Sequence, residues 1–117
     1  MEGQFDAIQS VKSIETNYGP QVAREVVQIF LSDYPGKIAK LKTAIEQGNA
    51  EGIRFTAHDI KSGTLSMGIK PMSTVCETIE RDGSKMDREK LQQLAQQLEN
   101  DYNEISRSYG EYLNIQH

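Results

Sequence analysis

The sequence has little of what would anchor a chain through disulfides, metals or lipid. Its single cysteine, Cys76, excludes an internal disulfide framework and a cysteine-based zinc site, and it suits a reducing compartment. No apolar run approaches the ~20 residues needed to span a bilayer. Residues 1–6 lack the basic start and the apolar run of a signal peptide. We therefore expect a soluble cytoplasmic protein with no membrane contact.

Basic residues are not in excess either. Thirteen Lys and Arg residues stand against 17 Asp and Glu residues, so the formal net charge is −4, and no basic stripe is present. Because nucleic-acid binders gain most of their affinity from basic side chains against phosphates, nucleic acid is not an expected partner. The mixed charges at residues 80–90 are most simply a solvated turn.

Apolar residues recur at helical spacing almost throughout, with no alternating strand pattern of useful length. This spacing predicts five helical segments, at about residues 4–16, 20–47, 50–67, from Pro71 onward, and from a capping box at residues 84–87 towards the C-terminus. Pro35 and Gly36 should kink or break the second segment, because proline removes a backbone hydrogen bond and clashes with the preceding turn. Asn49 is a plausible N-cap for the third.

Helices that each carry one apolar stripe, joined by short polar turns, pack as an antiparallel bundle. The expected fold is therefore all-α, an antiparallel four-helix bundle over residues 20–114 with an additional N-terminal helix in residues 1–18. Its last helix would bury a long seam that includes Tyr102, Tyr109 and Tyr112. No repeat, low-complexity tract or linker divides the chain, so residues 1–117 are expected to form one domain.

Most catalytic and cofactor motifs are absent. Ile38 follows Gly36-Lys37 where a phosphate-binding loop needs Ser or Thr. Phe55 stands three residues before His58, where a di-iron bundle would need Glu. The other histidine, His117, is the last residue, and neither histidine has metal-ligand spacing to Cys76. We therefore expect no metal and no resident cofactor.

His58 is the most informative residue. The core stripe of its segment passes through Ala57 and Ile60, so His58 should point to solvent or to a partner. Lys61 lies one turn further on, where its ammonium can reach a group attached to the imidazole. The face shared with His58 is mostly polar and consists of Arg54, Lys61, Ser62 and Leu65. A lone histidine on such a face is more often an ordinary surface residue.

The residues that follow His58 change this interpretation. Ser62, Gly63 and Thr64 are weak helix formers in the middle of a helical pattern, and such local inconsistencies tend to be functional. The first two are also small, which would keep the surface beside the imidazole low.

Residues 57–64, Ala-His-Asp-Ile-Lys-Ser-Gly-Thr, closely resemble the phosphorylation motif of histidine-containing phosphotransfer (HPt) domains, Ala-His-x-(Leu/Ile/Phe)-Lys-Gly-(Ser/Ala)-(Ser/Ala). The resemblance extends to residues 30–35, 44–49 and 76–80 and so covers roughly residues 30 to 80. This sequence has Ser62 where Gly is usual and Gly63 where Ser or Ala is usual. Met67 replaces the usual Leu, Ile or Phe, a volume-conserving change.

The resemblance implies a phosphorelay intermediate. His58 would accept a phosphoryl group from a receiver-domain aspartate, or from a hybrid histidine kinase, and pass it to a response-regulator receiver aspartate. Lys61 would stabilise the added charge, and Ser62 would donate its hydroxyl or simply leave space. The protein would be a monomeric carrier without its own ATP site, so it is not expected to be an enzyme, and Mg²⁺ would sit on the partner receiver only. The expected partner surface comprises Arg54, Gly63, Leu65 and Ile69.

Two other function classes stay open. A helical adaptor with an HPt-like fold would bind a partner without carrying phosphate, but a degenerate member is expected to lose His58 or Lys61, and both are present. A kinase or phosphatase fragment would use His58 in a dimeric bundle. An acidic residue, Asp59, does follow His58, but the Arg-(Thr/Asn)-Pro sequence that comes next in dimerising kinase domains is absent.

Overall fold

The computed structural model describes residues 5–115, and within that range the chain is helical with no strand. Its elements are α1 (Ala7–Tyr18), α2 (Pro20–Gln47), α3 (Ala50–Ser66), α4 (Lys70–Asp82), the short 3₁₀ turn η1 (Gly83–Lys85) and α5 (Arg88–Ile115). The five predicted helical segments are thus confirmed. The start expected at Gln4 lies outside the described residues, as does His117.

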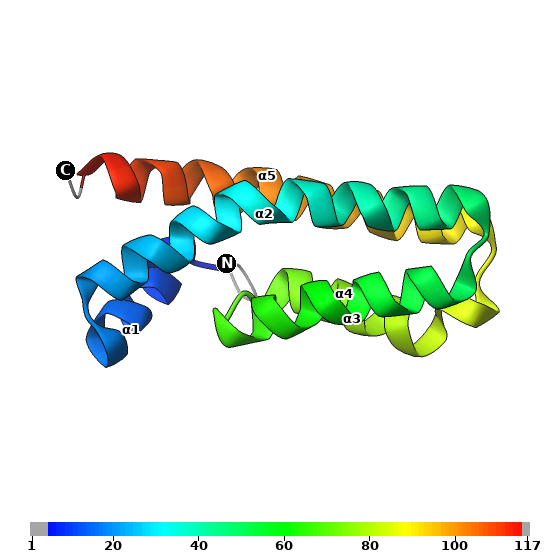
Figure 1. The fold of residues 1–117 in the computed structure, drawn as a ribbon, viewed down its shortest axis with the longest axis horizontal. Helices are drawn as coiled ribbons and strands as arrows, with labels where there is room; N and C mark the ends of the chain where they lie inside the picture. Colours follow the sequence, from blue (N-terminus) through cyan, green and yellow to red (C-terminus); the bar gives the residue numbers. More distant parts are fainter. Residues whose placement is uncertain (1–4, 116–117) are drawn as a thin grey trace.

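The helices form an antiparallel bundle with one helix added (Figure 1). The two long helices, α2 and α5, lie side by side in opposite directions. The α3–α4 hairpin packs against the C-terminal half of α2 and the N-terminal half of α5, and α1 packs against the other half of the long pair. The expected fold class, a four-helix bundle with an additional N-terminal helix, is confirmed.

The apolar stripes of all five helices pack together and form the core of the bundle. The three tyrosines of the α5 seam are buried, as expected, and their hydroxyls bond to other helices. The hydroxyl oxygens of Tyr109 and of Ser10 in α1 are hydrogen-bonded at 2.9 Å, and the Tyr112 hydroxyl donates to the carboxylate of Glu15 in the same helix. These bonds satisfy the buried hydroxyls and tie α1 to α5.

Local signals set the turns between the helices. Asn49 caps α3 as expected, since its side chain accepts from the Gly52 N–H at 3.0 Å. The capping box predicted at residues 84–87 is wrong. Residues 83–85 tighten into η1, with Gly83 buried, and Asp87 is the residue whose carboxylate accepts from the N–H of Lys90, at 2.9 Å.

Pro35 does not break α2, which continues as one helix from Pro20 to Gln47 and only changes direction near its middle (Figure 1). Proline lacks the N–H that would bond to the carbonyl of Leu31 four residues earlier. The hydroxyl of Tyr102, on α5, donates to that carbonyl at 3.1 Å instead. A donor from another helix thus replaces the missing backbone donor, so α2 is kinked, one of the two expected outcomes, and is not broken.

We expect Tyr102→Phe to lower the free energy of unfolding by about 1 kcal/mol, because it leaves the Leu31 carbonyl without this donor. In a Pro35→Ala background the same change should cost less, since the alanine N–H can bond to that carbonyl. Urea unfolding of the four proteins of this double-mutant cycle measures the difference. Equal losses in both backgrounds would show that Tyr102 does not compensate for Pro35.

Candidate functional site

His58 lies near the middle of α3 with 58% of its side chain exposed. Its neighbours on the core stripe, Ala57 and Ile60, are fully buried against the bundle. This pattern holds His58 on the opposite face of the helix, as its spacing predicted. Arg54, Ser62 and Leu65 are exposed on that face as well, so the structure brings these predicted site residues together around His58.

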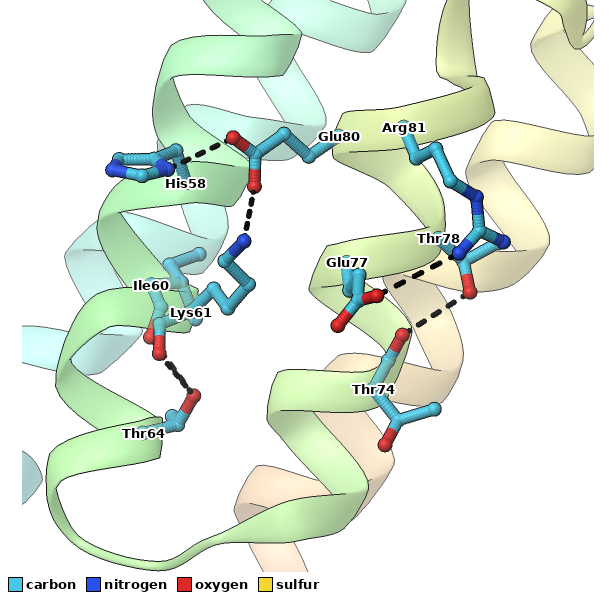
Figure 2. A network of polar contacts seen from close by, with 9 residues as sticks. All are labelled: His58, Ile60, Lys61, Thr64, Thr74, Glu77, Thr78, Glu80 and Arg81. Atoms are coloured by element: carbon cyan, nitrogen blue, oxygen red, sulfur yellow. Dashed lines mark hydrogen bonds and ion pairs between the residues drawn. The ribbon is translucent and has the colours of Figure 1, made fainter.

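The imidazole is held by a residue of the neighbouring helix. Glu80, on α4, has one carboxylate oxygen, Oε2, 2.8 Å from Nδ1 of His58. Its other oxygen, Oε1, lies 2.8 Å from the ammonium of Lys61. Figure 2 shows this carboxylate between the two side chains of α3, with the second ring nitrogen of His58, Nε2, on the side away from Glu80. The three residues form one ion-pair network between α3 and α4.

The network keeps both of its charged partners ionised. The hydrogen bond from Lys61 is the main cause that lowers the pKa of Glu80, and the bond with His58 acts in the same direction. Reciprocally, the bond to Glu80 raises the pKa of Lys61. A carboxylate can only accept hydrogen bonds, so Nδ1 of His58 carries a proton. In the neutral imidazole, Nε2 therefore has a free lone pair that faces solvent.

Sequence reasoning missed Glu80. The expectation that residues 80–90 are a solvated turn is wrong for this residue, which lies within α4 and has 22% of its side chain exposed. A usable signal was present, because residues 76–80 resemble an HPt segment that ends in glutamate. The contact itself depends on how α4 is rotated against α3, and spacing along one helix does not reveal that rotation.

Comparison with known proteins identifies the family. A family model described as Hpt domain matches residues 25–108 of the chain. The chain belongs to the HPt family. The HPt domain of a sensor hybrid histidine kinase from Shewanella has a similar structure, with a TM-score of 0.75 and 17% identity over 95% of this chain and 94% of that one. At 17% identity this structural similarity is evidence for a shared fold alone. No curated protein matches the chain.

HPt domains are phosphotransfer intermediates of two-component signalling and act as phosphocarrier modules without an ATP site of their own. In general they interact with receiver domains and histidine kinases. In residues 5–115 of this HPt domain, no helix is long and apolar enough to cross a bilayer. The same residues contain no group of three or more His, Cys, Asp or Glu side chains that could hold a metal ion.

Two of the residues expected on the partner surface of the HPt domain lie elsewhere. Ile69 is fully buried, so the prediction that it belongs to the partner surface is wrong. It follows Gly68, whose φ of 73° turns the chain, and its N–H bonds to the Thr64 carbonyl at 2.8 Å. This is the Schellman arrangement, in which the residue after the glycine packs back against the helix. Gly63 faces α2, where a Cβ would lie 1.8 Å from the hydroxyl of Tyr34.

The pKa of Glu80 should rise in a Lys61→Met variant, because the largest cause of its lowering is then lost. A carboxyl group whose pKa is lower in the folded than in the unfolded protein stabilises the fold at pH values above the ordinary pKa of glutamate. This contribution is lost as the pH falls through the lowered pKa of the folded state. The variant should therefore lose its bond to His58 at a higher pH than the wild type. NMR titration of the Glu80 carboxyl carbon measures both values, and identical midpoints would contradict the assigned cause.

Proposed function

We propose that this HPt domain accepts a phosphoryl group on Nε2 of His58 from the aspartyl phosphate of a receiver domain, or from a hybrid histidine kinase. It then passes the group to a receiver aspartate of a response regulator. The observation that carries this proposal is the bond between Nδ1 of His58 and Glu80, since it leaves the Nε2 lone pair directed outward. A fixed nucleophile that faces solvent can enter a partner's site without rearrangement of the bundle.

The transfer balances without an added proton acceptor. The Nε2 lone pair attacks phosphorus, the bond between phosphorus and the aspartate oxygen breaks, and the aspartate leaves as a carboxylate. The ring keeps its proton on Nδ1 and becomes positively charged, so the dianionic phosphoryl group and the imidazolium together carry one negative charge. Glu80 holds that proton and stabilises the charged ring, because the hydrogen bond strengthens as the ring becomes cationic. The reverse steps donate the group to the next aspartate.

Lys61 has the second role. Its ammonium carries three donors, of which the ion pair with Glu80 uses one. The others can stabilise the negative charge of a phosphoryl group attached to His58, one helical turn away. Ser62 is exposed on the same face, where it leaves room for the group or donates its hydroxyl to it.

The partner would supply the remaining chemistry. Mg²⁺ is expected on the receiver domain, where it neutralises the phosphoryl oxygens during transfer. The HPt domain would act as a monomer in the cytoplasm, where its single cysteine, Cys76, would stay a reduced thiol. That residue is buried, and burial raises the pKa of its thiol to about 12, so it is not a second nucleophile.

The test is intact mass spectrometry after mixing the protein with receiver domains charged by acetyl phosphate and Mg²⁺. The wild type should gain one acid-labile phosphoryl group, and the His58→Gln variant should gain none. Phosphoramidate, which phosphorylates histidine without a partner, should phosphorylate His58 of the wild type; peptide mapping separates this site from the second histidine, His117. If the wild type gains no phosphoryl group from either donor, the protein is not a phosphocarrier, and a phosphate-independent adaptor becomes the better account.

A further inference from the structure

We propose that Phe55 and Leu65 are the apolar anchors by which a receiver domain docks on this protein, with Arg54 as the charged contact beside them. The proposal rests on the proposed function, because it places the receiver over His58. It adds Phe55, which lies outside the phosphorylation motif of residues 57–64.

The two apolar side chains flank His58 along the exposed face of α3. Phe55 is 71% exposed and Leu65 is 59% exposed, although both are large and apolar. At a rise of 1.5 Å per residue, Phe55 lies roughly 5 Å before His58 along the helix and Leu65 roughly 10 Å after it. Between them on this face Ser62 is small and exposed, so neither anchor is screened from an approaching surface.

A partner that takes phosphate from His58 must cover this part of α3. Transient complexes bury less than about 1,200 Å² in total, which corresponds to a patch of roughly 14 Å radius on each partner. A patch of that size centred on His58 includes both anchors. Aromatic side chains and arginines are enriched at the centres of such interfaces, where removal from water gives them large contributions to binding.

The charges beside His58 favour a receiver as the occupant. Glu80 already pairs with Lys61, whereas Arg54 is exposed and has no ion-pair partner within residues 5–115. Its guanidinium lies one turn before His58, on the same face. The phosphorylated aspartate site of a receiver is anionic, so an uncompensated cation at this position attracts it and steers the encounter.

The experiment compares two reactions of the same variants. The first is transfer from the charged receiver domain that reacts fastest with the wild type, measured as kcat/KM and as the rate at saturating receiver. The second is phosphorylation by phosphoramidate, which needs no docking. The matched control is Tyr18→Ala, because Tyr18 is 70% exposed but lies at the end of α1, in the half of the bundle that α3 does not cover (Figure 1).

We expect Phe55→Ala to lower kcat/KM for the receiver by roughly 10-fold and Leu65→Ala by a smaller factor, mainly through KM. Phe55→Leu should recover part of the loss, and Arg54→Ala should weaken the dependence of kcat/KM on salt. The rates with phosphoramidate, and every rate of the Tyr18 variant, should stay within twofold of wild type.

The docking surface is wrong if Phe55→Ala transfers from the receiver like the wild type, or if Tyr18→Ala loses as much. An equal loss with phosphoramidate would also overturn it, because Phe55 would then act on the reactivity of His58. These outcomes differ from failure of the proposed function, in which the wild type itself takes phosphate from neither donor.

Discussion

In a Glu80→Gln variant, His58 should be phosphorylated roughly 10- to 100-fold more slowly than in the wild type, both by phosphoramidate and by a saturating concentration of charged receiver. The amide oxygen can still accept from Nδ1 of His58, so the ring keeps its orientation in part. The negative charge is lost, however, and with it the stabilisation of the cationic ring that forms as the bond to phosphorus is made. Lys61 also loses the partner that fixes its ammonium beside His58.

The matched control for this variant is Glu77→Gln. Glu77 lies on the same helix, less than one turn before Glu80, and is an exposed carboxylate 3.6 Å from Arg81 (Figure 2). Because exposed ion pairs contribute little, this change should alter neither the phosphorylation rate nor the melting temperature appreciably. Wild-type rates for Glu80→Gln, or equal losses for both variants, would mean that the His58–Glu80 bond has no part in the reaction.

A Gly63→Ala variant should lose about 1 kcal/mol of stability, although alanine is the better helix former. Overpacking a buried contact costs about 1–3 kcal/mol, and the gain in helix propensity offsets about 1 kcal/mol of this. The added Cβ would lie 1.8 Å from the hydroxyl of Tyr34. That ring cannot move aside easily, because it is buried and packs against the tilted ring of Phe30, with ring centroids 4.6 Å apart.

Two further variants test the cause. Gly36→Ala makes the same change in the interior of α2, where a Cβ meets nothing within 4 Å, so it should raise stability by about 0.5–1 kcal/mol. Tyr34→Phe removes the clashing oxygen and leaves a ring carbon at 3.1 Å, so it should rescue part of the Gly63→Ala loss. Thermal unfolding measures all of these, and a neutral or stabilising Gly63→Ala would contradict the packing explanation.

The sequence predicted features that depend on one helix at a time. The 3.6-residue period at Ala57 and Ile60 indicated which way His58 points, and the side chain of Asn49 indicated where α3 begins. The fold class followed from the number of amphipathic segments and the shortness of their turns. The first two inferences rest on residues within one or two turns of each other, and the third needs only a count of such segments and of the short turns between them.

Contacts between helices were the part that could not be predicted. Glu80 meets His58 only because α4 returns alongside α3, and Ile69 is buried only because the Schellman turn at Gly68 directs it inward. The continuity of α2 through Pro35 depends in the same way on Tyr102, which lies far along the chain in α5. In each case the deciding atom comes from another element, or from a turn whose backbone geometry residue types alone do not specify.

In the proposed mechanism Glu80 holds the Nδ1 proton of His58, so that Nε2 is the nucleophile. Long-range ¹H–¹⁵N NMR of the imidazole, recorded before and after phosphorylation with phosphoramidate, reports the position of this proton and of the phosphoryl group. The free protein should show the Nδ1–H tautomer, and the phosphorylated protein should show phosphorus coupling to Nε2 with the proton still on Nδ1. A proton on Nε2 in the free protein, or a phosphoryl group on Nδ1, would mean that Glu80 does not set the nucleophile.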